Sequence, residues 1–185
     1  MISDELHRQI ERTMWPDGDL TPGSLWAILD CARDTQVYPE LQTSRLGYEC
    51  LYSGELPTAL KHVAPHIVEL GPRYRFTRRL FDLCWGRNWC IFARLNDGTR
   101  LRGHLRKLLT VKTEDGRKLL FRFYDPRVLR TYLPTCNAEE LRAVFGPISI
   151  FYAESLDAMS TLRAYSFDGR DLCQVPDNAP IGRGN

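Results

Sequence analysis

Apolar side chains recur at helical spacing in several segments of the chain. Leu6, Ile10 and Met14 are each four residues apart, so they share one face of a predicted helix over residues 3–14, and Ser3 is a suitable N-cap for it. The same spacing predicts helices over residues 38–45, 56–63, 76–85 and 101–109, and two more that begin after the N-capping residues Asp125 and Asn137.

Short apolar runs that end at Gly, Pro or Asn residues indicate buried strands. They cover residues 24–30, 48–52, 66–70, 88–95 and 148–153. Asp115 and Gly116 lie between two further runs, 109–112 and 118–124. This Asp-Gly pair predicts a hairpin with a type I′ turn, because that turn needs a positive φ at both central residues.

The alternation of strands and helices predicts a mixed α/β (α+β) protein with two lobes. Residues 1–96 are expected to form an N-terminal α/β lobe around a mostly buried sheet, and residues 97–154 a more helical C-terminal lobe that carries the hairpin. Residues 155–185 form a C-terminal extension in which apolar periodicity fades, and we expect its tail, residues 176–185, to be disordered.

Composition is that of an ordinary folded protein: 185 residues, 43% of them hydrophobic and 26% charged. The longest uncharged stretches hold ten residues, half of the about 20 that a membrane-spanning helix needs, so no membrane insertion is expected. The first residues are charged and show no secretory signal, which favours a cytoplasmic protein. The six cysteines form no Cys-x-x-Cys pair, so we expect reduced, mostly buried thiols and no zinc site.

Charge is distributed unevenly along a chain whose net charge is only +2. Residues 71–130 hold 16 Lys or Arg and 5 Asp or Glu, a net charge of +11, whereas the rest of the chain carries −9. Arg100, Arg102 and Arg106 lie in or beside the predicted helix over 101–109, away from its apolar face. Such a basic face suits nucleic acid, phospholipid or an acidic protein partner.

The sequence contains no nucleophile motif, metal-ligand cluster or phosphate-binding glycine loop. Cys84 and Cys90 are the cysteines nearest to an electropositive patch, but the tryptophans beside them indicate apolar packing. We therefore expect a protein that is not an enzyme and that binds no cofactor and no metal.

Trp85 and Trp89 lie on either side of a predicted turn at Gly86. Such a pair either packs in the core or contributes to binding, because Trp is enriched in binding hot spots. Both interpretations stay open at this point.

Residues 122–127 join a predicted strand to a predicted helix. In one interpretation Asp125 caps the helix and pairs with a neighbouring arginine. In the other, Arg122, Tyr124, Asp125 and Arg127 form a surface for a protein partner. The two interpretations are compatible with each other.

Nucleic-acid binding by residues 71–130 is the main alternative to a protein partner. The arginines and lysines of this segment would neutralise several phosphates. No helix-turn-helix, zinc-finger or RNA-stacking motif accompanies them. Nucleic acid is therefore the less favoured partner.

Short motifs follow one another in a specific order between Leu25 and Phe151, a span of 127 of the 185 residues. In this order and spacing they resemble a bacterial family, the cytoplasmic adaptor chaperones of type VI secretion, long catalogued as a domain of unknown function. The motifs are Leu25–Asp30, Tyr48–Leu56, Ala64–Leu70, Trp85–Phe92, Leu101–Leu109, Leu120–Leu129, Leu133–Thr135 and Phe145–Pro147.

The resemblance implies a protein that is not an enzyme. Such adaptors bind a toxic effector protein in the cytoplasm and load it onto the VgrG-type spike protein at the tip of the secretion needle. The two-lobed fold of the family agrees with a division near Asp97, whereas Cys90 departs from the small residue, usually Gly, that the family has after the second Trp. The three arginines near the 101–109 helix, or the 122–127 junction, are then expected to contact the effector or the spike.

Overall fold

The computed structural model describes residues 1–16, 23–95, 101–113, 115–155 and 162–175. Within them, seven strands form one sheet in the order β2-β3-β1-β4-β7-β8-β9, and every neighbouring pair is antiparallel. These strands are β1 (Leu25–Asp30), β2 (Tyr48–Cys50), β3 (Pro65–Glu69), β4 (Cys90–Leu95), β7 (Ile148–Glu154), β8 (Leu162–Phe167) and β9 (Leu172–Val175).

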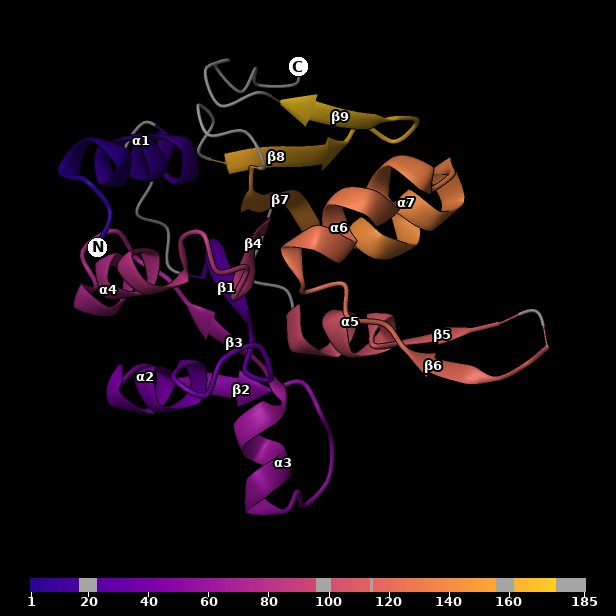
Figure 1. Cartoon of the computed structure of the whole chain (residues 1–185). Helices are drawn as coiled ribbons and strands as arrows, with labels where there is room; N and C mark the ends of the chain where they lie inside the picture. Colours follow the sequence, from indigo (N-terminus) through magenta and orange to yellow (C-terminus); the bar gives the residue numbers. More distant parts are fainter. Residues whose placement is uncertain (17–22, 96–100, 114, 156–161, 176–185) are drawn as a thin grey trace.

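A separate hairpin and a set of short helices complete the fold (Figure 1). The hairpin, β5 (Thr110–Lys112) and β6 (Lys118–Leu120), extends away from the rest of the molecule. The helices are α1 (Asp4–Met14), α2 (Val37–Thr43), α3 (Thr58–Val63), α4 (Arg75–Cys84), α5 (Leu101–Leu108), α6 (Pro126–Tyr132) and α7 (Ala138–Phe145), and a 3-10 turn, η2 (Leu133–Thr135), follows α6.

The sheet has a hydrophobic core on each face, because successive residues of a strand point to opposite sides. Leu29 and Phe92 pack on one face with buried residues of α1, α2 and α4. Ile28 and Ile91, their direct neighbours in the chain, pack on the other face with buried residues of α5, α6 and α7. Figure 1 shows these two groups of helices on opposite sides of the central strands.

The predicted mixed α/β class is confirmed, and the predicted caps explain where helices begin. The Ser3 hydroxyl accepts a hydrogen bond from the Leu6 N–H at 3.2 Å, at the start of α1. Asn137 Oδ1 accepts from the N–H of Glu140 at 3.0 Å, while the Glu140 carboxylate accepts from the Asn137 N–H at 2.8 Å. This capping box satisfies N–H groups that the helix itself leaves unpaired.

The hairpin is present, but its register differs from the predicted one. A two-residue Asp-Gly turn pairs Lys112 with Leu119, whereas the structure pairs Lys112 with Lys118. Gly116, at φ 82°, donates its N–H to the Thr113 carbonyl at 2.8 Å. Asp115, the other residue of the pair, does not have a positive φ. The predicted type I′ turn is therefore wrong, because that turn needs a positive φ at both central residues.

The last two strands of the sheet were not predicted from the sequence. β8 pairs with β7 and β9 pairs with β8, so the sheet continues well beyond residue 154. In β8 only Leu162, Ala164 and Tyr165 are buried, which is too short a pattern to stand out locally. The tail over 176–185, expected to be disordered, lies outside the described residues.

The six cysteines are free thiols, as expected, but only Cys31, Cys84 and Cys90 are buried. The other three are partly exposed. In the described part of the chain, no helix combines the length and the apolar character needed to cross a membrane.

Candidate protein-interaction surface

Asp125 fixes the start of α6 and the position of one surface cation. Its buried carboxylate accepts hydrogen bonds from the Arg127 backbone N–H at 2.9 Å, from Arg127 Nε at 3.0 Å and from Arg127 Nη2 at 2.5 Å. Burial by itself raises the pKa of Asp125, but the hydrogen bonds from Arg127 and the positive charges of Arg127 and Arg122 together outweigh burial and hold this pKa below its ordinary value. The Arg127 side chain is 50% exposed, so a charged, oriented guanidinium faces solvent.

Arg122 forms an ion pair with Asp30, the last residue of β1. The Asp30 side chain is 1% exposed and that of Arg122 is 41% exposed. Burial lowers the pKa of Arg122, but the hydrogen bond to Asp30 and the negative charges around Arg122 together outweigh burial and raise this pKa above the usual one. The guanidinium of Arg122 is therefore engaged within the protein, and only part of its side chain is accessible to a partner.

Tyr124 lies in the core rather than on the surface. It is 2% exposed, and its ring meets that of Phe123 edge-on, with the ring centroids 5.5 Å apart. Burial raises the pKa of its hydroxyl. Of the four residues that the sequence singles out here, Arg127 and part of Arg122 are accessible to solvent. Tyr124 and Asp125 are buried.

A groove of about 590 Å³ lies beside α6. Phe121 and Tyr132 form an aromatic wall, with ring centroids 4.6 Å apart in an edge-to-face arrangement. The groove is also lined by Asp125, Arg127, Val128, Thr131 and Thr135.

The β5–β6 hairpin carries an exposed apolar face that leads to this groove. Val111 pairs with Leu119 across the hairpin, and the two residues are 36% and 47% exposed. The Phe121 N–H donates to the Leu109 carbonyl at 2.8 Å, which continues the strand pairing beyond β6. Because alternate strand residues share a face, Val111, Leu119 and Phe121 form one apolar strip that runs to the groove.

The residues of this apolar strip were not among those predicted to form a site. The signal for them is Val111 between the polar residues Thr110 and Lys112 on one side of the hairpin turn, and the apolar run Leu119–Phe121 on the other. A two-stranded hairpin with such a pattern has no second layer to bury its apolar face. Both strands are in fact exposed along their whole length.

The three arginines near α5 do not act as one exposed face. Arg102 Nε donates to the Cys50 carbonyl at 2.9 Å and lies 3.5 Å from a Glu49 carboxylate oxygen, so it ties α5 to β2. Arg106 is exposed on the last turn of α5. Arg100 lies outside the described residues.

Trp89 belongs to the hydrophobic core, with an exposed fraction of 1%. Its backbone carbonyl accepts a hydrogen bond from the Asp30 N–H at 2.8 Å, next to the start of β4. Trp85 is partly buried and packs against the same core. The turn between them uses Gly86 at φ 75° and Asn88 at φ 55°. Trp89 therefore packs in the core, and of the two tryptophans only Trp85 is accessible for binding.

The buried thiols are poorly suited to nucleophilic chemistry. Burial raises the pKa of Cys31 to about 12 and that of Cys90 well above its ordinary value, so both stay protonated at neutral pH. In the described part of the chain, no group of three or more His, Cys, Asp or Glu side chains is placed to hold a metal ion.

The most distinctive surface is the apolar strip with its groove and Arg127.

Fold and surface together define a mixed α/β protein that carries an exposed apolar face. A family model described as a domain of unknown function (DUF4123) matches residues 25–143, and the chain belongs to this family. Neither the curated proteins nor the solved structures contain a significant match to the chain.

Proposed function

We propose that this protein is a non-enzymatic adaptor that binds an effector protein of a type VI secretion system in the cytoplasm and loads it onto the spike protein. The resemblance of its motif series to the adaptor chaperones supports this role. The observation that carries the proposal is the exposed apolar strip of Val111, Leu119 and Phe121, which continues into the groove beside α6.

Exposed apolar side chains that form a continuous face are typical of contact surfaces. The groove adds an aromatic wall, and Arg127 stands at its edge with an orientation fixed by Asp125. Interfaces combine such apolar centres with aromatic and Arg residues. A complementary effector segment has apolar side chains for the strip and a carboxylate for Arg127.

Ion pairs across the fold favour a protein partner over nucleic acid. Arginines of the basic segment, residues 71–130, pair with acids outside it, for example Arg78 with Asp4 and Arg122 with Asp30. These pairs neutralise part of the charge that phosphates would use. Further pairs of this kind join Arg79 to Glu40, Arg87 to Asp34 and Arg102 to Glu49.

The test is a pull-down of the tagged protein from its native host, with bound proteins identified by mass spectrometry and nucleic acid by the 260/280 nm absorbance ratio. We expect a spike protein and a secreted effector. The double variant Val111→Ser/Leu119→Ser makes the apolar strip polar and should reduce effector recovery by about tenfold, the equivalent of about 1.4 kcal/mol of binding free energy.

The matched control is Leu60→Ser/Val63→Ser on α3, whose apolar side chains are 39% and 46% exposed but lie outside the strip. It should recover the effector like the wild-type protein. Equal recovery by both double variants contradicts the role of the strip. Recovery of nucleic acid alone, lost steeply as salt is raised, contradicts the adaptor proposal and favours nucleic-acid binding.

A further inference from the structure

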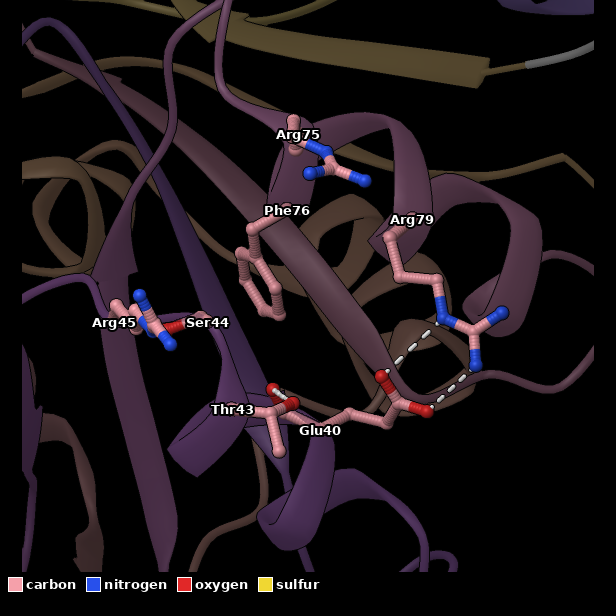
Figure 2. A pocket seen from close by; sticks show the side chains of 7 residues that line it. All are labelled: Glu40, Thr43, Ser44, Arg45, Arg75, Phe76 and Arg79. Carbon is pink, nitrogen blue, oxygen red and sulfur yellow. Dashed lines mark hydrogen bonds and ion pairs between the residues drawn. The ribbon is translucent and has the colours of Figure 1, made fainter.

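A second pocket, of about 570 Å³, lies between the end of α2 and the first turns of α4. Figure 2 shows three guanidinium groups around it, from Arg45, Arg75 and Arg79, and the ring of Phe76 pointing into its middle. Phe76 is 7% exposed, so it forms an apolar floor rather than a rim. The pocket therefore combines positive charge with an apolar base.

Among the described residues, only Arg79 of the three arginines has an acidic partner. Arg79 binds Glu40 through two contacts, Nη2 to Oε1 at 2.8 Å and Nε to Oε2 at 3.3 Å (Figure 2). Arg45 and Arg75 are exposed, and no carboxylate of the described residues pairs with either of them. The lining side chains thus carry a net charge of +2, from three arginines and one glutamate.

The backbone at Arg45 is held in an unusual conformation. Its φ is 59°, in the left-handed region that Gly and Asn adopt more readily than Arg. Just before it, the Ser44 hydroxyl accepts the Leu46 N–H at 3.1 Å and fixes the turn. A long cationic side chain is therefore present at a position where a smaller residue fits the backbone better.

We propose that this pocket binds an acidic segment of a partner polypeptide, with a carboxylate between Arg45 and Arg75 and a neighbouring apolar side chain on Phe76. Guanidinium groups match carboxylates geometrically and bind them with charge-assisted hydrogen bonds. The inference goes beyond the adaptor role, because it does not depend on which protein the apolar strip binds.

The charge balance of the pocket favours a carboxylate over a polyphosphate. Two unpaired guanidiniums complement one or two negative charges, and Glu40 repels a more highly charged group. The apolar floor at Phe76 complements an amino-acid side chain next to the carboxylate. A volume of about 570 Å³ is within the usual range of ligand sites.

The two sites lie on opposite faces of the sheet. Phe76 belongs to the core that α1, α2 and α4 build on one face. Phe121 and Tyr132 pack against the core on the other face. A polypeptide in the pocket and another on the apolar strip therefore do not compete for the same surface.

The experiment is a calorimetric titration of the full chain at low salt with an acetylated, amidated hexapeptide in which glutamate alternates with leucine. The matched peptide has glutamine in place of glutamate. We expect the acidic peptide to bind at least about tenfold more tightly than its glutamine counterpart. Equal affinity of the two peptides, or no binding of either, overturns the proposal.

Variants locate the binding site. Arg45→Asn/Arg75→Gln removes the two unpaired charges, and Asn tolerates the left-handed backbone at position 45. It should weaken binding of the acidic peptide by about tenfold or more. Arg73→Gln/Arg170→Gln removes the same charge at exposed positions outside the pocket and should bind like wild type. If both double variants lose the same affinity for the acidic peptide, the peptide binds by non-specific attraction to positive charge, and the proposal is overturned.

Glu40→Gln should increase the affinity for the acidic peptide rather than lower it. It removes the negative charge from the lining and frees Arg79, so the acidic peptide should bind several-fold more tightly. A role of Glu40 in folding alone does not produce this gain. A stronger response to inorganic phosphate than to the peptide overturns the proposal in favour of a phosphate ligand. The Val111→Ser/Leu119→Ser variant should leave the titration unchanged, so its outcome is independent of the proposed adaptor function.

Discussion

Arg122, on the segment between β6 and α6, forms an ion pair with Asp30 at the end of β1, 92 residues earlier in the chain. Asp30 also accepts a hydrogen bond from the Ala32 N–H at 3.2 Å. The contact therefore joins the segment that follows the apolar strip to a central strand of the sheet.

Arg122→Leu should lower the free energy of unfolding by about 2 kcal/mol, because it leaves the buried Asp30 carboxylate without its cation. The partial exposure of Arg122 keeps this value below that of a fully buried pair. Urea denaturation followed by circular dichroism measures the change. The control is Arg117→Leu, which breaks the exposed pair with Asp115 and should leave stability unchanged. The same loss in both variants contradicts the structural role of the Arg122–Asp30 pair.

Asp125→Ala should lower the free energy of unfolding by about 1 kcal/mol at neutral pH, since it removes the N-cap of α6. The pKa of Asp125 is lowered in the folded protein. Its stabilising effect is therefore present above the ordinary carboxyl pKa, about 4, and is lost as pH falls through the lower folded-state value. The difference between wild type and variant should narrow in urea titrations from pH 6 towards pH 2.

Ser3→Ala is the control for this pH dependence, because it removes an N-cap that has no titratable group. The loss in free energy of unfolding caused by Ser3→Ala should stay constant over the same pH range. If the loss caused by Asp125→Ala is equally constant, the charge on Asp125 is not stabilising.

Glu154→Gln should stabilise the protein above neutral pH. Burial raises the pKa of Glu154 to about 7, although backbone hydrogen bonds from Asn88 and Gly86 favour the charged form, and Arg130 donates to the Glu154 backbone carbonyl at 2.6 Å. A folded-state pKa above the unfolded one means that the contribution of Glu154 to stability is greatest below about pH 4 and falls as pH rises towards 7. The gain at pH 8 should be on the order of 2 kcal/mol, and it should vanish at pH 4. A gain in stability that is the same at all pH values contradicts a raised pKa of Glu154 in the folded protein.

Gly146→Ala should destabilise the end of α7. A Cβ at this position lies 2.3 Å from the His104 ring, and the backbone φ is 50°. His104 is held in place by a hydrogen bond to the Val144 carbonyl at 2.8 Å, so the ring cannot yield freely. Overpacking of this kind costs about 1–3 kcal/mol, which thermal denaturation detects.

Gly169→Ala separates this clash from backbone strain. Gly169 also has a positive φ, 99°, but no heavy atom lies within 4 Å of a Cβ built there. The variant should therefore cost less than Gly146→Ala. The reverse order would rule out the contact with His104 as the main cause.

The strands and helices as far as β7 were predictable from the sequence, because each depends on residues close together in the chain. The capping box at Asn137 involves residues within three positions, and the cap at Asp125 involves Arg127, two positions away. β1 is a continuous apolar run with a clear start and end. The hairpin was also predictable, although its register was not, since the Asp-Gly pair is compatible with more than one loop length.

The candidate site was predictable only in part. The sequence pointed to the junction at Arg122 and Arg127 and to the local pair of Asp125 with Arg127. It did not distinguish the accessible Arg127 from the buried Tyr124, because the two residues belong to the same short segment and differ only in what packs over them. The exposure of the apolar strip depends on the hairpin extending away from the sheet.

The sequence by itself determined the mixed α/β class, most elements and their caps, since these follow from periodicity and from hydrogen bonds within one or two turns. Only the tertiary structure decided the strand order, the addition of β8 and β9, and the partners of the charged residues. It also brought Arg45, in the segment after α2, and Arg75, in α4, to one pocket. These contacts join distant segments, so they depend on how the sheet is assembled and not on any local pattern.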